Sequence, residues 1–133
     1  MDYSLEFDPV NKFLKARFHG ILTDQVLQTY YARSGEYVAR NSARAAITDL
    51  SEITSIQISP ATVRSMAAQA PAVTQPGFVR IIVAPSSFAF GLSRMFQILG
   101  DDTRPNFHVV RSLGEAWLLL GVVEPHFEPI DGK

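Results

Sequence analysis

The sequence predicts a single α/β domain: a mostly parallel five-stranded sheet that opens with an antiparallel N-terminal hairpin, and four helices. Two observations carry this prediction. Two segments with alternating apolar and polar residues open the chain, and single helical segments then separate three short apolar runs. Strands that alternate with single helices form parallel sheets through right-handed crossovers. The predicted order is therefore strand, strand, helix, strand, helix, strand, helix, strand, helix.

Period-two alternation predicts the opening hairpin. Tyr3, Leu5 and Phe7 alternate with polar residues, and residues 14–18 repeat the pattern, as expected for strands with one buried face. Residues 8–11, Asp-Pro-Val-Asn, supply turn chemistry between them. An exposed hairpin edge can pair with a copy of itself, so a homodimer is one predicted assembly.

The first helix is predicted from Thr23, a suitable N-cap, to Asn41. Gly35 lies inside it, and glycine destabilises a helix interior by about 1 kcal/mol relative to alanine. We therefore expect close packing at Gly35. The apolar run 45–50 follows as a strand covered on both faces, and the polar segment 51–59 is predicted to be a loop.

Ser59 followed by Pro60 predicts the start of the second helix, because serine caps N-termini and proline suits the first helical position. Residues 78–84, Phe-Val-Arg-Ile-Ile-Val-Ala, form the most continuous apolar run and predict the middle strand of the sheet. The third helix is predicted from Ser86 or Ser87 to Gly100. Its expected buried stripe comprises Phe88, Leu92, Met95, Phe96 and Leu99.

A last strand, 107–111, and a helix that begins with the capping-box spacing of Ser112 and Glu115 complete the predicted domain. We expect the domain to cover residues 1–121. Residues 122–133 are expected to form a C-terminal tail.

Composition limits the classes of function. The 133 residues carry 12 basic and 13 acidic side chains without a basic run, which argues against nucleic acid as a partner. The chain has no cysteine, and its opening residues lack the features of a secretory leader. Its apolar runs are far shorter than the roughly 20 residues that cross a bilayer. We expect a cytoplasmic protein without integral membrane contact.

The sequence contains none of the familiar catalytic motifs. It has three histidines without metal-ligand spacing, and no GxSxG elbow, phosphate-binding loop or GxGxxG fingerprint. We therefore assign no catalytic residue, metal or cofactor, and expect the protein not to be an enzyme. Asp49, His19 and His108 are the groups that a less favoured enzyme hypothesis would use.

A segment rich in hydroxyl groups leaves the predicted strand 45–50 and enters the second helix. It carries Ser51, Thr54, Ser55 and Ser59. Partners and ligands meet open α/β sheets at this end, and a helix N-terminus favours an anion such as a phosphate on Ser55 or Ser59. These four residues are candidates for partner binding or phosphorylation. The alternative is that Ser59 is an N-cap and Ser51 a turn residue.

The third helix offers a second candidate site, formed by Phe88, Phe90, Arg94 and Phe96. We consider docking of a partner or binding of a hydrophobic molecule there, with ordinary core packing as the alternative. Phe90 lies off the apolar stripe and is expected to be exposed. Arg104, in a polar turn, is expected to pair with neighbouring acids at the surface.

The order of elements, with Asp49-Leu50-Ser51-Glu52-Ile53 leaving the central strand, resembles STAS domains of the bacterial anti-sigma-factor-antagonist type. Residues 47–51, 83–85, 91–96 and 116–121 look like small, stand-alone bacterial STAS-like proteins. The resemblance implies a regulatory module that switches protein partners through a phosphorylatable Ser or Thr at the second helix.

The chain departs from the family at that regulatory motif. Residues 54–57, Thr-Ser-Ile-Gln, stand where the family reads Asp-Ser-Ser-Gly or a close variant. Ser55 matches one serine of the motif, and Ile56 aligns closer to the residue that is usually phosphorylated. The favoured function is therefore non-catalytic protein docking through residues 51–59 and the start of the second helix. The alternative is a binder of a hydrophobic small molecule or lipid near the third helix.

Overall fold

The computed structural model describes residues 2–100 and 104–130, which form four helices and a six-stranded sheet. The strands lie in the order β5-β4-β3-β2-β1-β6. Their bounds are β1 Tyr3–Asp8, β2 Phe13–Thr23, β3 Ala45–Gln57, β4 Val79–Val83, β5 Phe107–Val110 and β6 Glu128–Pro129. The helices are α1 Asp24–Asn41, α2 Pro60–Ala68, α3 Ser87–Leu99 and α4 Leu113–Leu120. The predicted α/β class with a mixed, mostly parallel sheet is confirmed.

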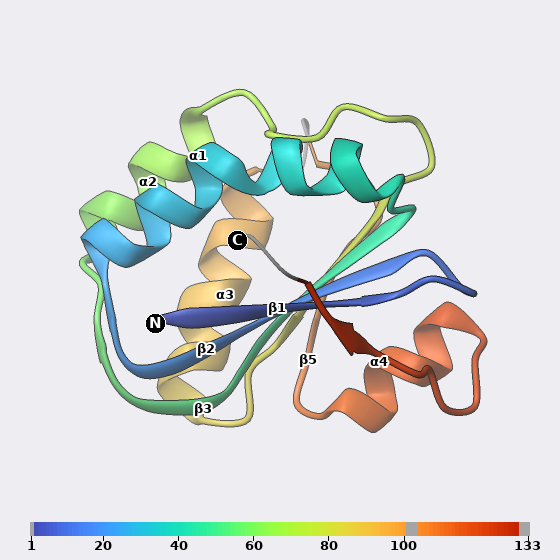
Figure 1. Cartoon of the computed structure of the whole chain (residues 1–133). Helices are drawn as coiled ribbons and strands as arrows, with labels where there is room; N and C mark the ends of the chain where they lie inside the picture. The colour runs from blue at the N-terminus through green and yellow to red at the C-terminus, as the bar shows by residue number, and fades with distance from the viewer. Residues whose placement is uncertain (1, 101–103, 131–133) are drawn as a thin grey trace.

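The helices cover the two faces of the sheet unequally (Figure 1). Helices α1, α2 and α3 pack on one core, and α4 packs on a second core with Phe13, Ile47 and Ile81. Strands β2, β3, β4 and β5 are parallel and advance in one direction across the sheet, so right-handed crossovers place α1 to α3 on the same face. The chain then returns to the opposite edge at β6, and the same handedness places α4 on the other face.

A sixth strand corrects the predicted count of five. Glu128 and Pro129 pair antiparallel with Phe7 and Glu6 on the outer side of the opening hairpin. The expectation of a free hairpin edge is therefore wrong over these residues. A strand of two residues is too short for an alternating pattern to reveal it. Its neighbours are nevertheless anchored, because Ile130 packs against the first core and Phe127 against the second. The division of the chain at residue 121 stays a prediction.

β3 is longer than predicted, because residues 51–57 continue the strand instead of forming a loop. Its register against β2 slips twice, and each slip inserts an extra residue into β3. Leu50, Ile53 and Ile56 consequently pack against the same core at a spacing of three. A spacing of three does not produce the alternation that identifies strands in a sequence.

β4 is not the middle strand. It lies beside the edge strand β5, and β3 and β2 occupy the centre. Its apolar run has another cause, because both of its faces are covered: Ile81 and Val83 contact the α4 core, and Ile82 lines the side of α1 to α3.

All four helices begin at the predicted type of cap. Thr23, Ser59, Ser86 and Ser112 each accept a backbone N–H with the side-chain oxygen. Gly35 is closely packed as predicted, since a β-carbon there would lie 2.5 Å from the carbonyl oxygen of Ala72. None of the helices in the described part of the chain is long and apolar enough to cross a membrane.

The buried face of α3 differs from the predicted stripe. Ala89 and Ser93 are its buried residues, whereas Phe88 and Leu99 are exposed. Small side chains on the inner face let a helix approach a sheet closely, and the larger side chains then flank the contact line. Leu92, Met95 and Phe96 are half-buried in this way against the first core.

Candidate functional site

The four predicted hydroxyl residues are all exposed. Ser51, Thr54 and Ser55 belong to the carboxyl half of β3, and Ser59 precedes α2. The predicted turn role of Ser51 is wrong, because that residue lies within the strand. The structure therefore presents these residues on one continuous segment, which we call the β3–α2 segment (residues 51–61).

Ser59 is the N-cap of α2, as the alternative interpretation held. Its Oγ accepts the N–H of Thr62 at 3.1 Å, and its own N–H donates to Oδ1 of Asp24 at 3.3 Å. A phosphate on Ser59 would lose this cap and meet the Asp24 carboxylate, which opposes a second negative charge. Ser55 has no such acidic neighbour among its contacts in the described residues; it pairs in register with Ile21.

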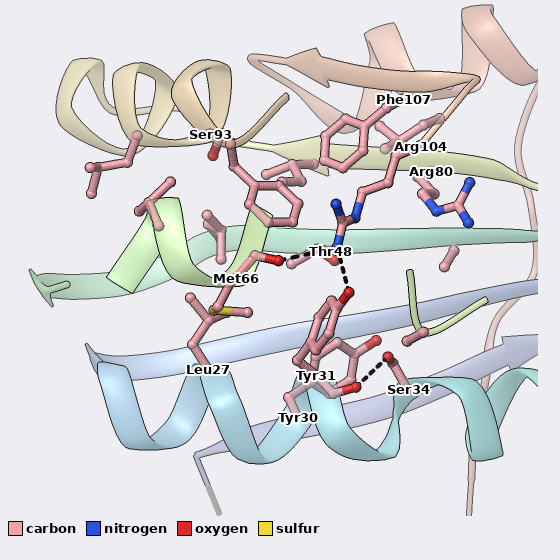
Figure 2. Close-up of a pocket in the computed structure, with 18 of the residues that line it drawn as sticks. Leu27, Tyr30, Tyr31, Ser34, Thr48, Met66, Arg80, Ser93, Arg104 and Phe107 are labelled. Atoms are coloured by element: carbon pink, nitrogen blue, oxygen red, sulfur yellow. Dashed lines mark hydrogen bonds between the residues drawn. The ribbon is translucent and has the colours of Figure 1, made fainter. Parts of the chain in front are cut away.

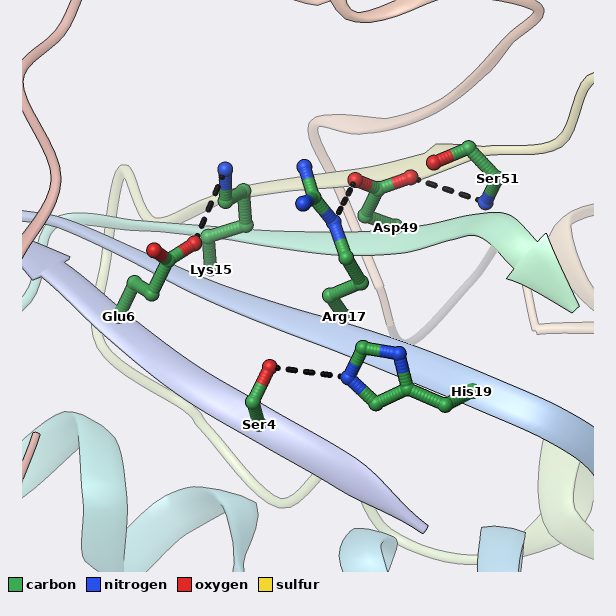
Figure 3. A network of polar contacts seen from close by, with 7 residues as sticks. All are labelled: Ser4, Glu6, Lys15, Arg17, His19, Asp49 and Ser51. Carbon is green, nitrogen blue, oxygen red and sulfur yellow. Dashed lines mark hydrogen bonds and ion pairs between the residues drawn. The ribbon is translucent and has the colours of Figure 1, made fainter. Parts of the chain in front are cut away.

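A buried ion pair lies behind the start of the β3–α2 segment (Figure 3). Asp49 is 0% exposed. Its carboxylate accepts a hydrogen bond from Nε of Arg17 at 2.9 Å and another from the backbone N–H of Ser51 at 3.0 Å. Carboxylates removed from water need such charged and N–H partners. Asp49 thereby fixes the backbone at Ser51, where β3 leaves the fully buried part of the sheet.

The groups named for an enzyme hypothesis are not assembled into one site. Asp49 is paired with Arg17, and the Nε2 of His19 lies 3.2 Å from Oγ of Ser4. His108 lies in β5, separated from β2 by β3 and β4. Within the described ranges, no hydrogen bond joins His19 to a carboxylate that could orient it, and no cluster of three metal-ligating side chains occurs.

The structure does not bring the four predicted residues of the third helix together. Phe88 is 59% exposed, and Arg94 is exposed on the helix surface. Phe90 was expected to be exposed, but it is half-buried because the Arg111 guanidinium lies 4.3 Å from its ring centre. Only Phe96 lines a cavity.

This cavity, of about 180 Å³, lies between the sheet and helices α1, α2 and α3 (Figure 2). Its wall is predominantly apolar. The lining residues include Leu27 and Tyr30 of α1, Leu50 and Ile56 of β3, Val63 and Met66 of α2, and Leu92 and Phe96 of α3. Concave apolar sites with a few polar groups are the usual form of small-molecule sites.

Arg104 reaches the cavity from the segment before β5. It is 3% exposed, so the expected surface position is wrong. The neighbouring acids with which it was expected to pair, Asp101 and Asp102, lie outside the described residues. Its guanidinium donates to the carbonyl oxygens of Ala67, Met66 and Gln69 at 3.1 to 3.2 Å. A cation at the C-terminus of a helix satisfies carbonyls that lack partners within the helix. Arg104 thus closes α2 and lies against the ring of Phe96.

Arg80 lines the cavity from β4. It donates to the carbonyl oxygens of Val73 and Pro105. Burial, and secondarily the neighbouring Arg104 charge, lower the pKa of Arg80. Arg80 was not among the residues predicted from the sequence. An arginine inside an otherwise apolar strand was nevertheless a usable signal, because charged side chains are rarely buried without a partner.

The solved structure of the anti-sigma factor antagonist SpoIIAA, in its unphosphorylated form, resembles this architecture. The match covers 92% of this chain and 99% of that chain, with a TM-score of 0.59. The chain has the STAS fold. Sequence identity over the match is 14%, so the likeness concerns the fold. No family model matches the sequence, and a comparison with curated proteins finds no match.

The STAS resemblance predicted from the order of motifs is confirmed at the level of fold. The similarity is not confined to one βα unit, because it covers nearly all of both chains.

Proposed function

We propose that this STAS-fold chain is a non-catalytic regulatory module that docks to another protein through the β3–α2 segment. The observation that carries the proposal is the match over 92% of the chain to a protein named for antagonising an anti-sigma factor. That protein acts in regulation, and the fold is shared. A protein partner, of unknown identity, is therefore the favoured ligand.

The geometry of the β3–α2 segment supports docking there. Its predicted residues are exposed, and the segment includes the carboxyl end of the parallel strand β3, the end at which α/β sheets meet their ligands. The Asp49 carboxylate holds the segment at Ser51, and the Ser59 cap holds it at α2. A surface held in one conformation loses less entropy on binding than a mobile loop.

The test is quantitative recovery of partners from native lysate with the tagged full chain. Thr54→Arg, Ser55→Arg and Ala61→Arg each place a bulky charge on an exposed position of the segment. Thr29→Arg is the matched control, because Thr29 is exposed on α1, outside the segment. We expect a specific partner to be retained by the wild type and by Thr29→Arg and lost with the three segment variants.

Two results would contradict the proposal. One is the recovery of no specific protein by the wild type. The other is equal recovery of the same protein by all four variants, which would place docking elsewhere. Ser55→Asp tests phosphate control in the same assay: a change in partner recovery relative to Ser55→Asn would support a charge-dependent switch at this position.

A second candidate function is the binding of a hydrophobic small molecule or lipid. The cavity beside α3 favours it, because an apolar space of about 180 Å³ is larger than closely packed interiors normally leave empty. Native mass spectrometry of the purified chain, combined with thermal shift across a panel of apolar molecules, tests it. Only unliganded protein and no shift in Tm would contradict this candidate.

A further inference from the structure

The cavity is apolar along its length but carries a cationic group that has no acidic partner among residues 2–100 and 104–130. The described residues form three ion pairs: Lys15 with Glu6, Arg17 with Asp49, and Arg40 with Glu36. Arg80 belongs to none of them. The partners it has in this part of the chain are two carbonyl oxygens and the ring of Phe78, whose centre lies 5.3 Å from its guanidinium.

Carbonyl oxygens orient a guanidinium without neutralising it. An arginine has five N–H donors in a planar fork, and two carbonyl contacts leave donors for a further acceptor. Charges in a partly buried, apolar setting are normally paired with an opposite charge, since removal from water is otherwise unfavourable. Arg104 places a second positive charge close enough to act on Arg80.

Two hydroxyl groups of the cavity wall have hydrogen-bond partners other than Arg80. The Tyr31 hydroxyl donates to the carbonyl oxygen of Ala70 at 2.7 Å and accepts from Arg104. Ser34, also in the wall, donates to the carbonyl oxygen of Tyr31 at 2.9 Å. Neither hydroxyl is paired with Arg80 in the described part of the chain, and a bound carboxylate would supply the missing acceptor.

We infer that the cavity is a binding site for a small amphipathic carboxylate, whose carboxylate pairs with Arg80 and whose apolar part lies among Leu50, Leu92 and Phe96. This inference deepens the second candidate function and rests on it. The volume sets the size of the occupant: about 180 Å³ corresponds to roughly six water molecules in the liquid. A medium-chain fatty acid matches that space better than a lipid with two long chains.

The experiment compares octanoate with octan-1-ol, which has the same chain and no charge. Binding to the full chain is measured by isothermal titration calorimetry, with chemical shifts of the cavity methyl groups as a second readout. We expect the wild type to bind octanoate at least about tenfold more tightly than octan-1-ol, the scale of one charge-assisted hydrogen bond. Because this comparison uses the wild type alone, its result does not depend on whether a variant folds.

Three variants locate the two parts of the site. Arg80→Met should abolish the preference for octanoate while keeping the binding of octan-1-ol. Thr48→Phe, which fills the cavity from β3, should remove both. Arg94→Met is the matched control, because Arg94 is exposed on α3 and outside the cavity, and it should behave as the wild type.

Equal affinities of the wild type for the two probes, or an unchanged octanoate affinity in Arg80→Met, would overturn the carboxylate assignment. If octan-1-ol still binds, the carboxylate assignment has failed but the second candidate function, binding of a hydrophobic molecule, is supported. The failure of one can therefore be told from the failure of the other. Binding of neither probe would overturn the site itself. Each outcome is independent of the docking test on the β3–α2 segment.

Discussion

The carboxylate of Asp8 accepts a hydrogen bond from the backbone N–H of His126 at 3.1 Å, across 118 positions of sequence. The same carboxylate accepts the N–H groups of Val10 and Asn11 at 2.9 and 3.1 Å. Asp8 thus closes the hairpin turn and holds the segment that leads to β6. One buried carboxylate joins the two ends of the described chain.

Asp8 should make the free energy of unfolding depend on pH in the acidic range. Burial acts to raise the pKa of Asp8, but hydrogen bonds from Asn11, Val10 and His126 outweigh it, so this pKa lies below its ordinary value. A lowered folded-state pKa contributes stability that is complete above the unfolded value of about 3.9 and is lost as pH falls through the folded value. Asp8→Asn should lower the free energy of unfolding at pH 7 by about 1 to 2 kcal/mol.

Urea unfolding at pH 7, 5, 4 and 3 measures this effect. The difference between wild type and Asp8→Asn should shrink as pH falls below about 4. Glu124→Gln, at an exposed position, is the control and should change little at pH 7. A difference between wild type and Asp8→Asn that stays constant over the whole range would contradict the role given to the ionised carboxylate.

Arg17→Met should destabilise the chain strongly, because among the described residues it leaves the buried Asp49 carboxylate with only the Ser51 N–H as a partner. Breaking a buried pair lowers stability by about 3 to 5 kcal/mol, and we expect the lower end because the Arg17 side chain is 31% exposed. Arg40→Met is the matched control: its pair with Glu36 is exposed and should contribute less than about 0.5 kcal/mol. Equal losses in the two variants, by thermal or urea unfolding, would refute this assignment.

Gly35→Ala and Gly91→Ala should change stability in opposite directions. Both glycines lie inside helices, where alanine is favoured by about 1 kcal/mol. At Gly35 the new β-carbon would lie 2.5 Å from the carbonyl oxygen of Ala72, so we expect a net loss of about 1 to 3 kcal/mol. At Gly91 a new β-carbon would meet no atom within 4 Å beyond its chain neighbours and the backbone of its own helix, and stability should rise. Differential scanning calorimetry of both variants would show the two signs.

Ser59→Ala should lower the free energy of unfolding by about 1 kcal/mol, because the Thr62 N–H loses its acceptor. Aspartate is itself a good N-cap, so Ser59→Asp should lose less, unless repulsion from Asp24 dominates. Ser55→Ala, at an exposed strand position, is expected to stay within about 0.5 kcal/mol of the wild type. A larger loss in Ser55→Ala than in Ser59→Ala would show that the cap is not the stabilising contact.

The local elements were predictable because each carries its own signal. The caps at Thr23, Ser59, Ser86 and Ser112 mark the helix starts, and strict alternation marks the hairpin. β3 beyond Leu50 was missed because two register slips replace alternation with a spacing of three. β6 was missed because its two residues are held by pairing with β1, which is remote in sequence.

The cavity was beyond sequence inference for a related reason. Its wall combines residues from three helices and the sheet, and only the fold brings Arg80 and Arg104 to one end of it. Of the four residues chosen on α3, Phe96 alone faces it, because the buried side of the helix is set by the small residues Ala89 and Ser93. The apolar neighbours of Arg80 in the sequence could have drawn attention to it. Which acceptors its N–H groups contact is visible only in the structure.

The β3–α2 segment has two sides. Ser55 and Ala61 face solvent, whereas Ile56 within the segment and Val63 in the α2 turn that follows it form part of the cavity wall. An occupant of the cavity and a partner on the surface would therefore contact the same strand and helix from opposite sides. If one changes the affinity for the other, thermodynamic reciprocity requires the effect to be equal in both directions: the protein partner would set how tightly the small molecule is held.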